Sequence, residues 1–191
     1  MVEYVKNFQL DDDSIRKRNQ TIQLIKKIIE DNYLNTSVIL YGSYPQGLST
    51  KFSDLDFTVK TNQNINLDNI ADILKCEFDN IKKVGKNVPI IKARCKKTNI
   101  FVDISINQKG EKAANSIRNI ISKNPFLKYV FIVLKNILEP YMNTFYGGIS
   151  SFLLFHLIYY FYFVSEKSKM FFIMLIIFSI FIVILNMNYM Q

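Results

Sequence analysis

Apolar residues near the start of the chain have the spacing of one helical face. The series consists of Ile15, Ile22, Ile25, Ile28 and Ile29, and it predicts an amphipathic helix that ends near Tyr33. Residues 11–14, three aspartates and a serine, stand just before it, where acidic side chains and hydroxyls stabilise a helix N-terminus. Three adjacent aspartates also suggest a metal site, but the helix start is the preferred interpretation.

Alternating segments farther along the chain predict β-strands. Residues 37–41 form a short apolar run that stops at Gly42. In residues 54–59, apolar side chains occupy one face, while Asp54 and Asp56 share the other. Residues 88–93 and 99–106 are two further expected strands, and the second of them places Asp103 opposite its isoleucines.

Longer periodic segments predict helices between and after these strands. They cover residues 68–78, 111–122 and 125–138, and another helix opens after Gly147 and Gly148. His156, the only histidine, is expected to be an ordinary helix residue with a local partner.

The charge balance favours an anionic partner. The 191 residues include 24 Lys and Arg against 16 Asp and Glu, a net charge of +8, which suits nucleic acid, nucleoside triphosphate or an anionic membrane. Cys76 and Cys95 form no C-x-x-C pair, so the sequence predicts no zinc site and a reducing compartment. The first residues contain no apolar signal segment.

The end of the chain differs in composition from the rest. No charged side chain follows Lys169, and residues 171–185 are apolar apart from Ser179. Residues 170–189 are therefore either a membrane anchor, with Lys167 and Lys169 on the cytoplasmic side, or the product of a truncated or misread reading frame. Both interpretations stay open.

Three carboxylates carry the strongest chemical signal. Asp54 and Asp56 lie two residues apart on a strand, so both project from one face, and their hard oxygen atoms suit magnesium. The alternation of a later strand places Asp103 on its polar face as well. If the strands pair, the three carboxylates converge and can hold two metal ions, with Asp103 as the base or metal ligand at the attacking hydroxyl.

Phosphate-binding features accompany the carboxylates. Gly42 permits a sharp turn, after which Ser43 and nearby backbone N–H groups can hold the phosphates of a nucleotide. A second anion site is expected where a helix begins near Ser150 with a hydroxyl cap. Lys135, on an otherwise apolar helix, either faces an anion or extends to solvent at the helix edge.

Residues 82–97 carry seven basic residues and no acidic one. This segment is either a surface that tracks RNA by neutralising phosphates or the solvated face of a hairpin. It lacks interleaved aromatic residues, which is consistent with a substrate bound without regard to sequence.

Several motifs together resemble a known family. Residues 40–59, from Leu-Tyr-Gly-Ser to Asp-Leu-Asp-Phe-Thr-Val, look like the DNA polymerase β superfamily of nucleotidyltransferases. Val88–Lys92, Val102–Asn107, Val133–Lys135 and Gly147–Ser151 follow in the order typical of the nuclear poly(A) polymerases of the TRAMP complex and of terminal uridylyltransferases. The resemblance covers about residues 1–164.

The resemblance implies a role for each matching position. Asp54, Asp56 and Asp103 correspond to the catalytic triad that binds Mg2+, or Mn2+ in its place, and Gly42 and Ser43 to the triphosphate cradle. The remaining implied contacts are to the nucleotide: Asn115 and Ser116 to the ribose, Lys135 and Ser151 to the phosphates, and Phe152 to the base. Phe152 stands where many relatives have tyrosine, so it keeps the stacking face and loses one hydroxyl.

The resemblance also implies a fold and a function. We expect an α/β (α+β) polymerase β-like palm with a mixed sheet in residues 1–122. A partial central helical domain in residues 123–165 and the tail of residues 166–191 are expected to follow. The implied reaction adds AMP from ATP to RNA 3′ ends, in the nucleus and with RNA-binding and helicase subunits of a surveillance complex. The alternatives are UTP as donor, a small-molecule acceptor, or a membrane-tethered or truncated pseudoenzyme that binds nucleotide.

Overall fold

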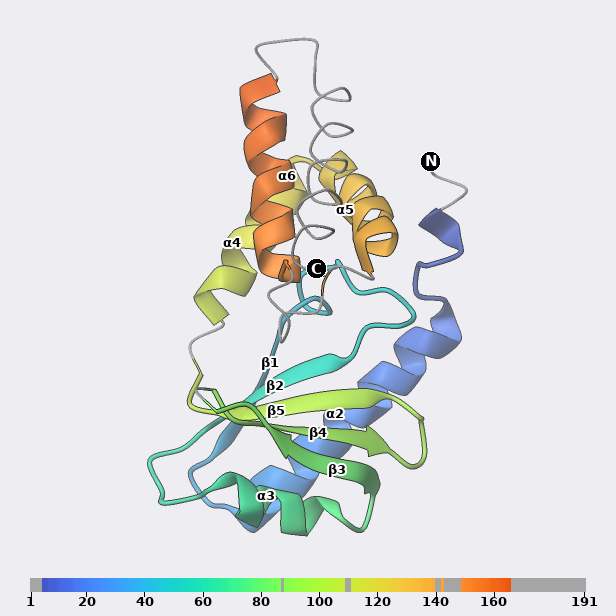
Figure 1. Ribbon diagram of the computed structural model, residues 1–191. Coiled ribbons are helices and arrows are strands. Elements are labelled where there is room, and N and C mark those ends of the chain that lie inside the picture. Colours follow the sequence, from blue (N-terminus) through green and yellow to red (C-terminus); the bar gives the residue numbers. More distant parts are fainter. Residues whose placement is uncertain (1–4, 87, 109–110, 140–141, 143–148, 166–191) are drawn as a thin grey trace, which may run out of the picture. The chain divides into compact units, whose positions relative to one another are not determined.

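The computed structural model describes residues 5–86, 88–108, 111–139, 142 and 149–165 (Figure 1). The chain divides into two compact units. One comprises residues 8–120, and the other comprises residues 1–7 together with residues 121–191.

A five-stranded mixed sheet forms the centre of the unit of residues 8–120. Its strands are β1 (Ser37–Tyr41), β2 (Leu55–Lys60), β3 (Phe78–Val84), β4 (Ile90–Cys95) and β5 (Phe101–Ile106), in the spatial order β1-β2-β5-β4-β3. Strands β2 and β5 run parallel, and the other neighbours run antiparallel. This arrangement confirms the predicted mixed-sheet α/β fold class.

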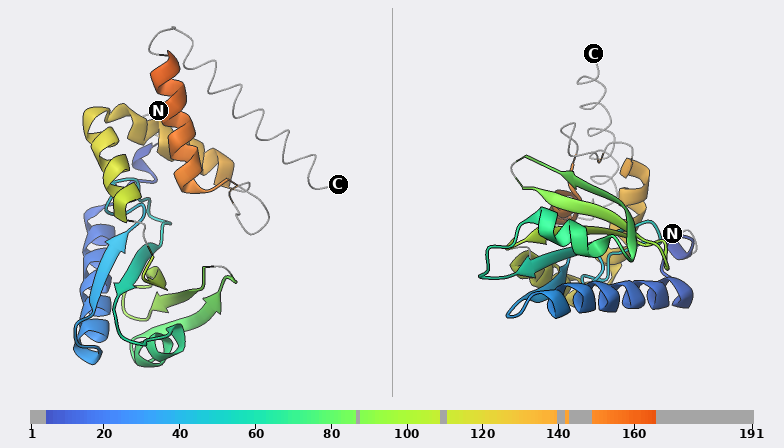
Figure 2. Two further views of the ribbon diagram at one scale, coloured as in Figure 1. Left: turned by 90° about the vertical axis from the view of Figure 1, so that its left-hand side faces the viewer. Right: turned by 90° about the horizontal axis from the view of Figure 1, so that it is seen from below.

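Two helices cover one face of the sheet. Helix α2 (Asp12–Asn32) runs along this face (Figure 2), and α3 (Leu67–Leu74) packs beside it. The alternation in β2 turns Leu55, Phe57 and Val59 toward the helices, and all three are fully buried. Burial of this face leaves the opposite face of the strands to the polar side chains of the candidate site.

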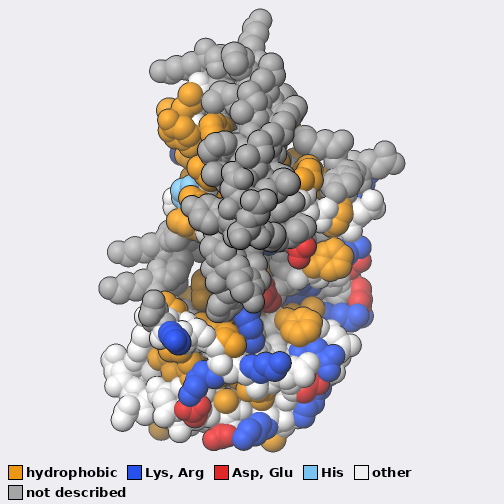
Figure 3. All heavy atoms as spheres, viewed as in Figure 1, with side chains coloured by type: hydrophobic (Ala, Val, Ile, Leu, Met, Phe, Trp, Pro, Cys, Tyr) orange, Lys and Arg blue, Asp and Glu red, His pale blue; other side chains and the backbone are white. Residues whose placement is uncertain are grey.

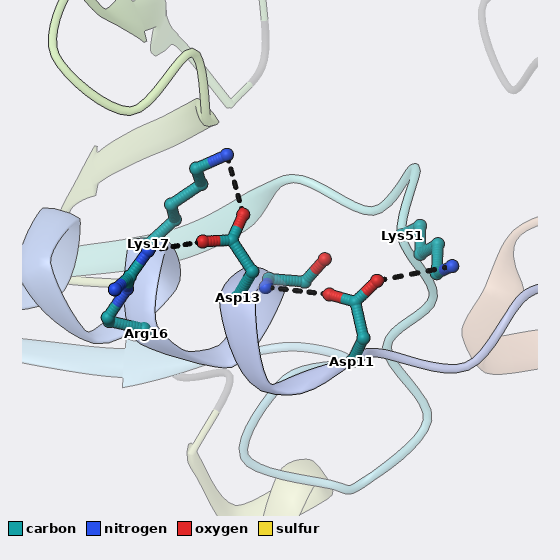
Figure 4. Close-up of polar contacts among 6 residues, drawn as sticks. Asp11, Asp13, Arg16, Lys17 and Lys51 are labelled. Atoms are coloured by element: carbon teal, nitrogen blue, oxygen red, sulfur yellow. Dashed lines mark hydrogen bonds and ion pairs between the residues drawn. The ribbon is translucent and has the colours of Figure 1, made fainter.

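Asp11 caps α2, and Asp12 and Asp13 lie in its first turn, so the three aspartates mark a helix start as the sequence predicted. Asp11 Oδ1 accepts a hydrogen bond from the backbone nitrogen of Ser14 at 2.8 Å, and Lys51 Nζ lies 3.3 Å from Asp11 Oδ2 (Figure 4). The hydrogen bonds from Ser14, together with Lys51, lower the pKa of Asp11 to about 2. Asp13 pairs with Arg16 and Lys17 on the helix surface. These contacts identify a helix N-terminus.

Arg18 ties α2 to the loop that leads into the carboxylate pair. Its side chain is 1% exposed, and Nη2 lies 3.0, 3.2 and 2.6 Å from the carbonyl oxygens of Thr50, Lys51 and Ser53. Because Ser53 directly precedes Asp54, this buried guanidinium fixes the path of the chain into β2. Burial lowers the pKa of Arg18, and the three carbonyl dipoles are its compensating partners.

Replacing Arg18 with Met is expected to lower the free energy of unfolding by about 2–4 kcal/mol, because three carbonyls lose a charged donor in a buried place. The measurement is chemical denaturation monitored by far-UV circular dichroism. Arg16→Met is the matched control, since the Arg16–Asp13 pair is exposed and its loss should change stability little. Equal losses in the two variants would contradict the role of Arg18.

The second unit contains two packed helices among its described residues. Helix α5 (Phe126–Leu138) meets α6 (Ser151–Ser165), and the rings of Phe131 and Phe155 lie 6.0 Å apart in an edge-on arrangement. Helix α4 (Glu111–Lys123) crosses the boundary between the units. The domain limits expected from the sequence, including a partial helical domain in residues 123–165, stay a prediction.

The described helices include none that is long and apolar enough to cross a bilayer. The expected anchor of residues 170–189 lies outside the described residues.

Strand β3 was not predicted from the sequence. The expected helix of residues 68–78 ends at Leu74, and β3 begins at Phe78. The pairing of β3 with β4 shifts register between Asp79 and Lys82, where Asn80 has a φ of +52°. This irregularity breaks the apolar alternation that would have identified a strand.

Candidate active site

A row of four polar side chains crosses the sheet on the face opposite the helices. Tyr41 of β1 pairs with Asp56 of β2, Asp56 pairs with Asp103 of β5, and Asp103 pairs with Lys92 of β4. Residues in register on neighbouring strands project from the same face, so the row brings the predicted carboxylates of β2 and β5 side by side. Asp54 directly precedes β2, and its carboxylate lies close enough to Lys92 for the lysine to interact with both Asp54 and Asp103.

Lys92 is the cation of this row. Its Nζ lies 2.5 Å from Asp103 Oδ2 and 3.9 Å from Asp54 Oδ2. Burial alone would lower the pKa of Lys92, but the hydrogen bond to Asp103 and the charges of Asp103, Asp54 and Asp56 raise it overall. Lys92 therefore stays charged and holds two of the carboxylates in place.

Burial dominates the electrostatics of Asp103. Its side chain is 14% exposed, and this burial raises the pKa of the carboxyl group. The hydrogen bond from Lys92 acts in the opposite direction, and the charge of Asp54 adds to the increase. The pKa of Tyr41 is also raised, chiefly by burial; Ser105 acts in the opposite direction, and the charges of the three carboxylates add to the increase.

Gly42 lies against the carboxylate of Asp56. Its φ is +73°, and a Cβ at this position would overlap the Asp56 side chain. The turn that follows is closed by hydrogen bonds from Leu48 N to Ser43 O at 3.0 Å and from Gly47 N to Tyr44 O at 3.1 Å. The predicted cradle of Gly42 and Ser43 is thus a turn that directly adjoins the carboxylates.

Two helices hold this turn in place. Tyr44 donates its hydroxyl to Asn19 Oδ1 of α2 at 3.0 Å, and Arg118 Nε of α4 donates to the carbonyl of Pro45 at 2.8 Å. Asn115 and Ser116, the expected ribose contacts, are exposed on the same helix within one turn of Arg118. Their contact with ribose stays a prediction.

The carboxylate face suits a divalent cation in its chemistry. Asp54, Asp56 and Asp103 supply the hard oxygen ligands that magnesium prefers, and the glycine at position 42 leaves room beside Asp56. Within the described part of the chain, no three acidic, His or Cys side chains are gathered as a ready metal site. The ammonium group of Lys92 is the cation between Asp54 and Asp103.

Replacing Lys92 with Met is expected to lower the free energy of unfolding of the metal-free protein by about 1–2 kcal/mol, since two carboxylates lose their counter-charge while the lysine is partly exposed. Mn2+ should restore more stability to the variant than to the wild type. Thermal unfolding with and without Mn2+ measures both effects.

Lys82→Met is the control for this prediction. Lys82 pairs in register with Lys92 but is exposed on β3. An unchanged response to Mn2+ in Lys92→Met would contradict the role of the ammonium as a resident cation.

The other predicted nucleotide contacts lie in the second unit. Lys135 is half-buried in the last turn of α5, Ser151 opens α6, and Phe152 is half-exposed. Ser150 Oγ accepts the backbone N–H of Leu153 at 3.1 Å, which confirms the predicted hydroxyl cap. Gly147 and Gly148 lie outside the described residues, and the nucleotide contacts of Lys135, Ser151 and Phe152 stay predictions.

His156 has the local partner expected of it. Its Nδ1 lies 2.9 Å from the carbonyl oxygen of Phe152, and the two rings are 4.2 Å apart.

Basic residues of the β3–β4 region are largely engaged within their own unit. Four of the seven contact residues of this unit: Lys83 pairs with Asp68, Lys92 with Asp103, Arg94 with Asp79, and Lys96 with the carbonyls of Lys75 and Cys76. Figure 3 shows basic and acidic side chains interspersed over the sheet-bearing unit. The four pairings agree with a solvated hairpin, and RNA contact by this segment stays a prediction.

Sequence reasoning missed two residues that shape the site. Lys92 had a usable signal, because alternation in residues 90–95 places Lys92 and Arg94 opposite Ile91 and Ala93. Arg18 had none, since its polar position on an amphipathic helix looks like an ordinary surface residue.

The fold and the site together define the class of polymerase β-like nucleotidyltransferases. Among solved structures, the polymerase core of TRAMP, a RNA surveillance complex, matches with a TM-score of 0.74 and 26% identity, over 83% of this chain and 52% of that chain. A cytoplasmic RNA terminal U-transferase has the same fold, with a TM-score of 0.74 and 18% identity over 84% of this chain and 52% of its own.

The family follows from the sequence comparison. The family model described as "Poly(A) RNA polymerase, mitochondrial-like, central palm domain" matches residues 1–119, and the chain belongs to this family. Poly(A) RNA polymerase protein 2 of Saccharomyces cerevisiae is 29% identical over 159 residues, which cover 77% of this chain and 27% of that protein. Poly(A) RNA polymerase cid14 of Schizosaccharomyces pombe is 26% identical over 149 residues, covering 72% and 22%. The chain thus spans about a quarter of the length of these relatives.

Proposed function

We propose that the chain is the catalytic palm of a template-independent nucleotidyltransferase that adds AMP from ATP to RNA 3′ ends. The observation that carries the proposal is the register of β2 and β5, in which Asp56 pairs with Asp103 beside the Gly42–Ser43 turn. The names of the curated relatives support the same class of reaction.

The proposed reaction is an in-line displacement. The oxygen of the RNA 3′-hydroxyl forms a bond to the α-phosphorus of ATP, the bond to the β-phosphate breaks, and pyrophosphate leaves. The turn at Gly42 and Ser43 holds the leaving phosphates through backbone N–H groups and the serine hydroxyl. Asp103 accepts the proton of the 3′-hydroxyl, a role that suits a carboxyl group whose pKa is raised by burial.

Metal binding belongs to the same proposal. Asp54, Asp56 and Asp103 would hold Mg2+, or Mn2+ in its place, and such an ion supplies charge neutralisation at the phosphates and activation of the hydroxyl. The turn and the row of carboxylates provide the positioning, which carries much of the rate in phosphoryl transfer.

The choice of ATP and of partners is also part of the proposal. Relatives named as poly(A) RNA polymerases support ATP, and the solved polymerase core of TRAMP, a RNA surveillance complex, supports RNA substrates. RNA-binding and helicase partner subunits and a nuclear location complete the proposal and rest on the resemblance alone. UTP is the second candidate donor, because an RNA terminal U-transferase has the same fold.

The test is extension of a 5′-labelled oligo(A) primer by the purified chain with Mg2+ and each of the four nucleotides separately. We expect extension with ATP at least about tenfold faster than with the others, which corresponds to about 1.4 kcal/mol of discrimination. Faster extension with UTP would move the assignment to a uridylyltransferase. ATP binding with no extension under any condition would reject the proposed catalysis and identify a nucleotide-binding pseudoenzyme.

A further inference from the structure

Phe101 is an exposed aromatic residue on the carboxylate face of the sheet. It opens β5 two residues before Asp103, so the two side chains project from the same face. Its side chain is 57% exposed, whereas Val102 and Ile104, which alternate with these residues, are fully buried in the core. Phe101 therefore adds little to the core, and its ring is available at the site.

The neighbours of Phe101 are polar and fixed. Leu55 pairs with Val102, and Asp54 and Phe101 are the residues directly before them in the chain. On the other side Phe101 pairs with Arg94, whose Nε and Nη2 donate to the two carboxylate oxygens of Asp79 at 2.9 and 2.8 Å. An exposed ring between an acidic residue and a paired arginine offers a flat apolar surface in a polar setting.

The ring of Phe101 lies on the side of the site that the acceptor RNA, and not the nucleotide, would occupy in the proposed reaction. The Gly42–Ser43 turn follows β1, on one side of Asp56, whereas Phe101 and Asp103 lie on β5, on the other side. In-line attack requires the hydroxyl to approach the α-phosphorus opposite the leaving pyrophosphate. The 3′ end of the acceptor RNA therefore belongs on the β5 side of the site, where Phe101 lies.

We infer that Phe101 is a stacking platform for the 3′-terminal base of the acceptor RNA, a role that rests on the proposed function. Residues two apart on a strand have their Cα atoms about 6–7 Å apart, so a ribose whose 3′-hydroxyl meets Asp103 has its own base within reach of the ring. A phenyl ring stacks on any base and donates no hydrogen bond, so it would receive acceptor RNA with any 3′-terminal base.

The experiment measures RNA binding without nucleotide or metal, by fluorescence anisotropy of a 5′-labelled oligo(A). Two RNAs are compared, one complete and one with an abasic 3′-terminal residue. Phe101→Leu is expected to raise the Kd for the complete RNA by about five- to 50-fold, the loss of one stacked base, and to leave the Kd for the abasic RNA unchanged. Phe101→Trp should retain tight binding of the complete RNA.

Phe52→Leu is the matched control, because Phe52 is also exposed but its ring packs edge-on against Phe8, 6.4 Å away. An equal loss of affinity for both RNAs, no loss for either, or no measurable binding by the wild type would overturn the platform. Primer extension by the wild type, measured separately, tests the proposed function, whereas RNA binding tests the platform. The failure of one hypothesis can therefore be distinguished from the failure of the other.

Discussion

Asp56→Asn is expected to reduce RNA 3′-end extension by at least about 1,000-fold, which corresponds to about 4 kcal/mol of transition-state stabilisation. Asn is nearly the same size, so the substitution removes a charge from the row without removing its volume. Asp56 lies between Tyr41 and Asp103 in register and against Gly42, where the proposed triphosphate turn meets the carboxylates. The loss should therefore appear in kcat/KM.

The measurement is steady-state extension of a labelled primer, with the unfolding midpoint of each variant as a check on the fold. Asp68→Asn is the control, because Asp68 lies on α3 and pairs with Lys83. This exposed pair should change stability by less than about 1 kcal/mol and leave extension unchanged. Extension that persists in Asp56→Asn at the wild-type rate would remove the carboxylate row from catalysis.

The sequence was sufficient to predict the carboxylate strands because their alternation is strict. Leu55, Phe57 and Val59 all face the core, so Asp56 has to face the other way. Asp103 has the same phase between Val102 and Ile104. The parallel pairing of β2 and β5, however, joins residues 47 positions apart along the chain, and no local pattern specifies that register.

The missed features depend on tertiary contacts. Arg18 is buried because a loop from residues 50–53 covers it, and this loop is remote in sequence from α2. Lys92 meets Asp103 only through the pairing of β4 and β5. β3 carries a register shift at Asp79–Lys82, so the pattern of its side chains matches no regular strand. In each case the deciding partner comes from another segment of the chain.

Gly42→Ala is expected to reduce extension by at least about 100-fold and to lower the free energy of unfolding by more than backbone strain alone explains. A left-handed φ of +73° costs a residue with a Cβ about 1–2 kcal/mol. In addition, the new methyl group would overlap the Asp56 carboxylate, so either the side chain rotates away or the turn shifts. Both displace the carboxylate from the phosphate turn, and a misplacement of about 1 Å is enough for a 100-fold loss.

Gly47→Ala separates these two causes. Gly47 has a φ of +74°, almost equal to that of Gly42, but a Cβ there meets no atom within 4 Å. Gly47→Ala should therefore show the backbone cost of about 1–2 kcal/mol in chemical denaturation and nearly wild-type extension. If both variants lose the same activity, then strain in the turn matters and contact with Asp56 does not. Loss confined to Gly42→Ala ties the glycine to the placement of the Asp56 carboxylate, since φ is nearly the same at both positions.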